Sequence, residues 1–346
     1  MRIGTAHQTY AQAESLLDSN MQRFMLAAFF ILLAAFPYLA SDYWIYLACL
    51  VGINIISVTG LNILTGFTGL VSLGHAAFMA VGAYTVALME KHIGSPFVFN
   101  LIVAGGVAAL IGMFVGIPSL RVKGLYLAVA TIAAAIILHF VFAQWAFVGR
   151  TGGMNVTPAK LFGLELTRYW QVYWLIIPVA ALAILAAANL FRTRIGRAFI
   201  AIRDRDISAE VLGIPLLRYK LLSFAISSFY AGVAGGLWAY MQRTVTPESF
   251  PLETSIFLLA AVIIGGMGSI LGGILGAIFM TLVPDMLKIA VSWLTPVFPN
   301  APALLAPVRT IVFGGLIIGF LLFEPKGLAE IWRRVRRFFH LWPFRK

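Results

Sequence analysis

Apolar runs of about 20 residues recur along most of this chain, and charged residues collect in short segments between them. An α-helix rises 1.5 Å per residue, so a run of about 20 residues spans the roughly 30 Å hydrocarbon core of a bilayer. Apolar residues make up 61% of the 346 residues and charged residues only 11%. This is too few charges to cover the outside of a soluble protein, so the sequence predicts an all-α, polytopic membrane bundle.

We expect about ten transmembrane segments between residues 24 and 323, flanked by tails at 1–23 and 324–346. The glycine-rich stretch 265–269 favours two segments over one long helix in its region. The first and eighth segments are short for a full crossing. The ten predicted spans are residues 24–39, 43–63, 71–89, 98–118, 125–147, 169–190, 221–241, 253–266, 270–288 and 305–323.

The distribution of basic residues predicts the orientation of these spans. Eighteen of the 25 Lys and Arg residues lie in 1–23, 119–124, 191–220 and 324–346. An amino terminus inside the cell places all four segments in the cytoplasm, as the positive-inside rule requires. Both termini are then cytoplasmic. The net charge of +12 is explained by this arrangement, which argues against binding of nucleic acid.

The longest polar interruption is residues 192–220, with seven basic and three acidic side chains. Within it, Ile207, Val211 and Ile214 recur at helical spacing, which predicts a short amphipathic helix over 206–212. Gly213 and then Pro215 would end that helix. A short helix held at the membrane surface offers a contact surface to another protein.

Several blocks of sequence resemble the branched-chain amino acid permeases of bacterial ABC importers. Their cytoplasmic coupling loop is similar to the segment from Gly196 to Ile214 here, although Ile207-Ser208-Ala209 replaces the Glu-Ala-Ala of many ABC permeases. The other matching blocks are Gly60–Gly66 with Gly69, Ser72–Phe78, Ile264–Ser269 and Glu324–Leu328.

The resemblance implies a type II-like permease subunit in the bacterial inner membrane that imports branched-chain or other hydrophobic amino acids. It implies a second homologous permease, two ATPase subunits that bind the ATP, and a periplasmic protein that delivers the amino acid. Permeases for urea, short amides or aromatic acids look similar and stay as alternatives for the cargo. A stand-alone channel or secondary transporter is the remaining alternative.

Motifs for chemistry within this chain are missing from the sequence. A phosphate-binding P-loop needs a Gly-Lys dipeptide, and none occurs. Metalloprotease and hydrolase motifs are also absent, so we expect neither an enzyme nor a cofactor. Among the carboxylates only Asp285 approaches the membrane interior, near the outer end of its span, which argues against ion-coupled transport.

Two groups of residues are candidates for function. From the resemblance we expect contact with the ATPases at Arg203, Asp204, Ile207, Glu210, Leu212 and Gly213. Polar side chains in or near the other glycine-rich stretch, residues 66–74, are candidates for the translocation path, with ordinary interhelical hydrogen bonds as the alternative. These residues are Asn54, Asn62, Thr65, Ser72 and His75.

The carboxyl-terminal tail alternates Ile331, Trp332 and Val335 with arginines. This pattern is typical of a basic amphipathic segment on anionic lipid headgroups. The alternative is a topology anchor with no further role.

Overall fold

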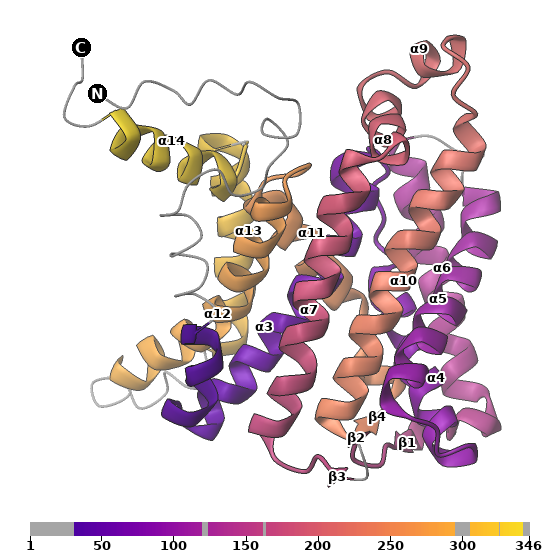
Figure 1. Cartoon of the computed structure of the whole chain (residues 1–346), viewed down its shortest axis with the longest axis vertical. Coiled ribbons are helices and arrows are strands. Elements are labelled where there is room, and N and C mark those ends of the chain that lie inside the picture. Colours follow the sequence, from indigo (N-terminus) through magenta and orange to yellow (C-terminus); the bar gives the residue numbers. More distant parts are fainter. Residues whose placement is uncertain (1–30, 120–123, 162–163, 295–304, 325, 342–346) are drawn as a thin grey trace.

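The computed structural model describes residues 31–119, 124–161, 164–294, 305–324 and 326–341. Within these ranges long helices run nearly parallel and form one bundle (Figure 1). The helices are α3 (Asp42–Asn62), α4 (His75–His92), α5 (Phe97–Ser119), α6 (Leu125–Gln144), α7 (Tyr169–Arg192), α8 (Arg194–Asp204), α9 (Asp206–Val211), α10 (Leu216–Gln242), α11 (Leu252–Gly265), α12 (Ile270–Leu294), α13 (Leu305–Phe323) and α14 (Leu328–Leu341).

The helical membrane bundle is confirmed, but the count of ten spans is not. Among the described residues, seven helices are long and apolar enough to cross a membrane. In α4 the last turn carries Glu90, Lys91 and His92, which shortens its apolar part. In α13 the described apolar stretch is 311–320, which is too short to be counted as a crossing. Most of the predicted first span, 24–39, lies outside the described residues.

Helices α3 and α10 occupy the centre of the bundle, because 72% of the apolar membrane-spanning stretch of each is buried inside the protein. Helix α10 crosses α4 and α5 at glycines. A Cβ atom on Gly235 would lie 1.9 Å from the carbonyl oxygen of Met79 in α4, and one on Gly232 would lie 2.6 Å from that of Ala104 in α5. The backbones therefore approach as closely as in other small-residue helix contacts within membranes.

The predicted division of residues 253–288 into two segments is confirmed. Helices α11 and α12 are antiparallel and touch through glycine, because a Cβ on Gly265 would lie 2.0 Å from the carbonyl oxygen of Gly272. The chain turns between them at Gly266, whose φ of +113° is strained for any residue with a side chain.

The bundle has two distinct ends. Helices α8 and α9 stand at one, here called the α9 end, and the short strands lie at the other, the β end (Figure 1). Strand β1 (Met154–Asn155) pairs antiparallel with β4 (Thr244–Val245), and β2 (Lys160–Leu161) pairs with β3 (Leu164–Glu165). Three 3-10 turns accompany them: η2 (Ala146–Val148), η3 (Arg150–Gly152) and η4 (Pro247–Ser249).

Asp285 lies near the start of α3 at the β end. Its carboxylate is only 14% exposed and accepts a hydrogen bond from the Tyr43 hydroxyl at 2.8 Å. Lys288 lies 2.9 Å from the same carboxylate oxygen. Two protein partners therefore hold this carboxylate at the β end.

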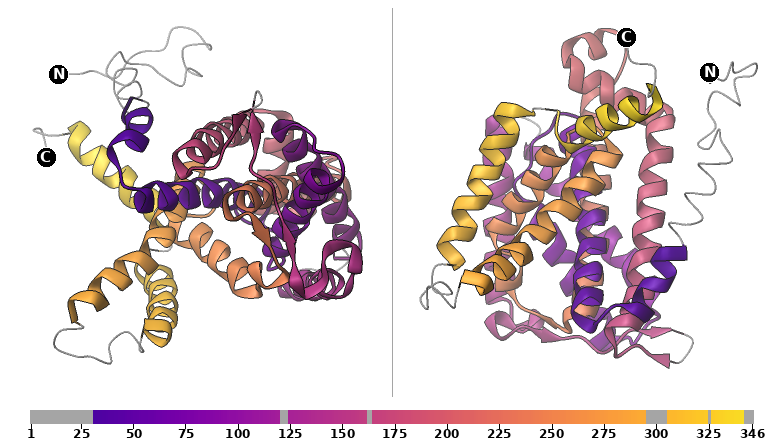
Figure 2. Two further views of the ribbon diagram at one scale, coloured as in Figure 1. Left: turned by 90° about the horizontal axis from the view of Figure 1, so that it is seen from below. Right: turned by 90° about the vertical axis from the view of Figure 1, so that its left-hand side faces the viewer.

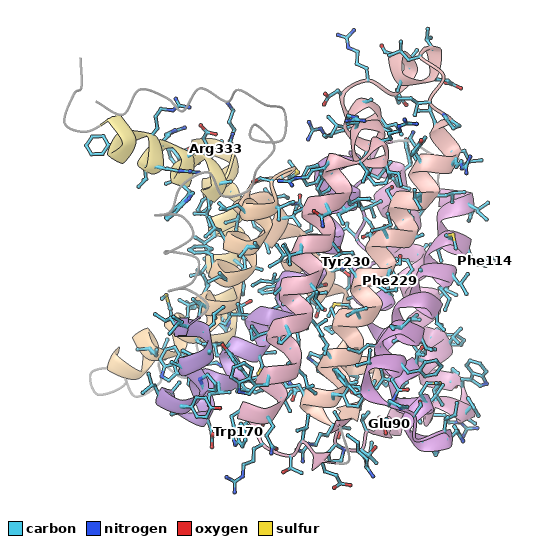
Figure 3. All side chains as sticks on the ribbon, viewed as in Figure 1. Glu90, Phe114, Trp170, Phe229, Tyr230 and Arg333 are labelled. Atoms are coloured by element: carbon cyan, nitrogen blue, oxygen red, sulfur yellow. The ribbon has the colours of Figure 1, made fainter. Side chains whose placement is uncertain are left out.

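Large apolar side chains cover the outer faces of the bundle. Phe114, which points outward from α5 in Figure 3, is 78% exposed. Apolar surface of this extent fits contact with lipid or with another membrane subunit. Further exposed examples are Leu110, Ile136, Phe140, Leu182, Ile311 and Leu322.

Helix α14 lies at the α9 end and runs across the direction of the spanning helices (Figures 1 and 2). Arg334 lies 2.7 Å from Glu324, and Arg333 lies 3.2 Å from Glu330. Trp332 is 53% exposed on the apolar side of the helix. The tail therefore folds into the amphipathic helix that its pattern predicts.

Candidate functional site

The polar segment 192–220 folds into helices rather than an open loop. Thr193 begins α8, where its hydroxyl accepts a hydrogen bond from the backbone N–H of Gly196. Phe199 and Ile202 are buried and fix α8 to the bundle. Helix α9 follows directly after Arg205, and the two consecutive helices together are here called the α8–α9 hairpin.

Helix α9 confirms the predicted short helix and ends as expected. The backbone N–H of Gly213 donates to the carbonyl of Glu210 at 2.9 Å, and that of Ile214 donates to Ala209 at 3.0 Å. Gly213 has φ +84°, the left-handed conformation common after a helix. This geometry explains a glycine at that position without any contact to a partner.

The apolar side chains of α9 face away from the bundle. Ile207 is 70% exposed, Val211 83% and Leu212 79%, whereas Ala209 is 2% exposed. Only the small Ala209 is buried, and the larger apolar side chains of α9 stay largely exposed. The hairpin thus presents an uncovered apolar surface at its tip, with Glu210 exposed beside it.

Arg203 and Asp204 lie at the base of the hairpin. The Asp204 carboxylate is 63% exposed and accepts hydrogen bonds from Nε and Nη2 of Arg203, both at 3.1 Å. Nη1 of Arg203 points the other way and donates to the carbonyl of Gly66 at 3.0 Å. The guanidinium therefore binds the bundle, while Asp204 faces outward.

Gly66 belongs to a π-helical turn, η1 (Ile63–Phe67), that continues α3. Such a turn places its hydrogen bonds out of step with an α-helix and is frequent at functional sites. The carbonyls freed nearby find side-chain donors: the Thr68 hydroxyl donates to Ile63 at 3.0 Å and the Thr65 hydroxyl to Leu70 at 3.2 Å. Thr65 is thus occupied in shaping this turn.

Asn62 joins this turn to the break between α11 and α12. Its Oδ1 accepts from the backbone N–H of Gly268 at 3.0 Å, and its Nδ2 donates to the carbonyl of Ser269 at 2.8 Å. Asn62 is 2% exposed, so both bonds are shielded from water. Both the oxygen and the nitrogen of its amide thus bond backbone groups, which favours the structural alternative for this residue.

The other predicted path residues are also inside the bundle. Asn54 donates to the hydroxyl of Thr281 at 2.9 Å, and the Ser72 hydroxyl accepts from the backbone N–H of Gly74. His75 begins α4 and is 1% exposed. Its Nε2 is buried and has no hydrogen-bond partner within the described part of the chain. Among the five path candidates, only His75 has a buried side-chain polar atom without a hydrogen-bond partner in the described residues.

Two cavities lie near these elements, and none of the five path candidates lines either. One, of about 540 Å³, opens beside the α8–α9 hairpin between residues 68–71, residues 202–208 and Lys220. The other, of about 290 Å³, is apolar and lies beside Phe229 and Tyr230 between α5, α7 and α10, midway between the two ends (Figure 3).

Glu90 is a polar centre that the sequence did not reveal. It lies near the β end (Figure 3), where its Oε1 accepts from the Tyr240 hydroxyl at 2.6 Å and from Asn100 Nδ2 at 3.0 Å. Its Oε2 accepts from the Thr157 hydroxyl at 2.8 Å. One carboxylate thereby joins α4, α5, α10 and the loop before β2. Its partners are 10 to 150 residues away, and no local pattern marks them.

Comparison with known proteins gives a consistent result. The family described as branched-chain amino acid transport system / permease component matches residues 43–321. The permease protein LivM of the high-affinity branched-chain amino acid transport system of Escherichia coli is 32% identical, with 90% of this chain and 76% of LivM covered. A probable branched-chain amino acid permease, LivH of Methanocaldococcus jannaschii, is 26% identical over 80% of this chain and 89% of its own. The autoinducer 2 import permease LsrC of an Enterobacter species is 28% identical over 63% of each chain.

Proposed function

The chain belongs to the family of permease components of branched-chain amino acid transport systems, and we propose that it works as a permease subunit of an ABC importer for these amino acids. The chain provides part of the path through the membrane. Separate ATPase subunits supply the energy, because the sequence carries no phosphate-binding loop of its own.

The observation that carries this proposal is the uncovered apolar tip of the α8–α9 hairpin. A short amphipathic helix with apolar residues turned outward is the form that docks into a groove on another protein. Ile207 and Leu212 enter an ATPase groove, and Glu210 fixes the orientation at its rim. The contact transmits the closing of the ATPases on ATP to the permease.

The α9 end faces the cytoplasm in this proposal, where ATP is available. The β end then faces the periplasm and receives the amino acid from a binding protein. Basic helix α14 lies at the α9 end, where Arg333 and its neighbours meet anionic headgroups. A second homologous permease chain completes the path.

For the transported solute, the proposal has an alternative to branched-chain amino acids. LsrC carries the name of an autoinducer 2 importer, so related permeases serve solutes other than amino acids. The 32% identity to LivM, over more of the chain, favours branched-chain amino acids. Competition for uptake among leucine, isoleucine, valine, urea and an aromatic acid separates these cargoes.

The test of coupling replaces Ile207 and Val211 by serine in the assembled importer. Both side chains are largely exposed, so the substitutions leave the fold unchanged and remove apolar contact area. We expect the ATPases to dissociate and binding-protein-stimulated ATP hydrolysis to vanish. Replacing the exposed Glu210 by lysine, which leaves Gly213 and the end of α9 intact, lowers the stimulation as well. Unchanged stimulation in both variants contradicts the proposal.

A further inference from the structure

The base of the α8–α9 hairpin lies against a group of glycines that belong to three separate parts of the sequence. We call Gly66, Gly266, Gly268 and Gly327 the glycine junction. A Cβ on Gly268 would lie 2.6 Å from Nη1 of Arg203 and 3.0 Å from the carbonyl oxygen of Gly66. The Arg203 guanidinium thus lies in a slot that two glycines leave open.

Backbone contacts continue from this slot to α14. A Cβ on Gly66 would lie 2.4 Å from the backbone nitrogen of Gly268, so η1 and the α11–α12 break touch directly. A Cβ on Gly327 would lie 2.5 Å from the backbone nitrogen of Gly266. The break therefore also contacts the turn that begins α14. Backbone packed on backbone has no flexible side chain in between to absorb a displacement.

Asn62 holds the two main parts of the junction together. It belongs to α3, one turn before Gly66, and its amide bonds Gly268 and Ser269. Arg203 donates a hydrogen bond to the Gly66 carbonyl of the same turn. A shift of Arg203 therefore reaches the α11–α12 break by two routes, through Gly66 directly and through Asn62.

The 540 Å³ cavity gives the hairpin room to move. It is lined by residues 68–71, by residues 202–208 and by Lys220. Beside this space the Lys220 ammonium of α10 forms an ion pair with the Asp206 carboxylate at 3.7 Å. The hairpin thus bonds the segment 66–74 at Arg203 and pairs with α10 at Lys220, and the cavity opens between these two contacts.

We propose that Arg203 is a positioning residue that transmits movement of the α8–α9 hairpin to the glycine junction, and through it to α3, α11 and α12. This inference rests on the proposed coupling to ATPases. It changes the expected role of Arg203 from contact with the ATPase to contact within the permease. Asn62 acts in the same relay rather than on the solute.

The experiment uses the complete importer in proteoliposomes and measures solute uptake and ATP hydrolysis together. Arg203→Gln removes the charged donor, whereas Arg203→Lys keeps one N–H donor for the Gly66 carbonyl. Arg218→Gln, an exposed arginine in the first turn of α10, is the matched control. The measured quantity is solute transported per ATP hydrolysed.

We expect Arg203→Gln to lower this ratio by at least about fivefold, the lower range of coupling between protein sites, while the ATPases still co-purify. Arg203→Lys restores part of the ratio, and Arg218→Gln leaves it unchanged. Asn62→Asp, which keeps one of the two bonds, also lowers the ratio. The double variant Arg203→Gln with Asn62→Asp lowers the ratio by less than the product of the two single effects, because both residues act in one relay.

Hydrogen exchange at the Gly268 amide supplies a readout that does not depend on uptake. In the intact importer, a non-hydrolysable ATP analogue changes exchange at residues 265–273, and Arg203→Gln abolishes that change. A normal coupling ratio and a normal exchange response in Arg203→Gln overturn the inference. Loss of the ATPases from Arg203→Gln also overturns it, because Arg203 is then an ATPase contact. Failure of the unmodified chain to bind ATPases contradicts the proposed function instead.

Discussion

The side-chain oxygen of Asn62 accepts a hydrogen bond from the backbone N–H of Gly268 at 3.0 Å, across 206 residues of sequence. The same amide donates to Ser269, so one side chain satisfies two backbone groups at a break between helices. Asn62→Leu leaves both groups without this partner. We expect the free energy of unfolding to fall by about 2–6 kcal/mol, since each of the two unsatisfied buried groups costs about 1–3 kcal/mol.

Cys49 provides the measurement. It is the single cysteine of the chain and is fully buried, so a thiol-reactive dye labels it only as the protein unfolds. The midpoint of labelling on heating should fall clearly in Asn62→Leu. Asn155→Leu, at an exposed position of β1, is the control with little change. Equal midpoints in the two variants would show that the Asn62 bonds contribute nothing.

The crossing of α4 and α10 depends on Gly235. A methyl group there would lie 1.9 Å from the Met79 carbonyl oxygen, so Gly235→Ala forces the helices apart. We expect a loss of about 1–3 kcal/mol or more from overpacking. Gly106→Ala is the matched control, because nothing lies within 4 Å of its added Cβ. It should gain up to about 1 kcal/mol from helix propensity. The dye assay measures both, and a tolerated Gly235→Ala contradicts the close crossing.

The fold class and the motif-bearing segments could be predicted from the sequence, because they depend on local pattern. The length of the apolar runs predicts the membrane helices, and the helical spacing of Ile207 and Val211 predicts α9. The inward direction of Arg203 could not be predicted, since it depends on a carbonyl 137 residues away. The role of Asn62 has the same origin. The sequence predicts that Asn62 is buried beside a glycine-rich stretch. It does not predict the backbone partners of Asn62 in the α11–α12 break.

Glu90 should stabilise the β end of the bundle. Its carboxylate accepts from Tyr240, Asn100 and Thr157, and hydrogen bonds to a charged group contribute about 1.5–3 kcal/mol each. Glu90→Ala is expected to lower the labelling midpoint more than Tyr240→Phe does. The double variant should lose less than the sum of the two, because they share one bond. Lys91→Ala, at the exposed neighbouring position, serves as control. Strict additivity would argue against a shared network.

His75 is the candidate for contact with the solute. It is 1% exposed, and its Nε2 has no hydrogen-bond partner within the described residues. We expect His75→Ala to change the uptake rate by at least about fivefold, close to 1 kcal/mol in activation free energy, with the ATPases still bound. His139→Ala, on the exposed side of α6, should leave uptake unchanged. Normal uptake in His75→Ala assigns that imidazole to packing.

The most direct test of the central claim compares vesicles that hold this chain alone with vesicles that hold the whole importer. Uptake of labelled leucine is measured in both, with and without enclosed ATP. A permease moved by separate ATPases gives uptake only with its partners and ATP together. Leucine flux through this chain alone would contradict the claim.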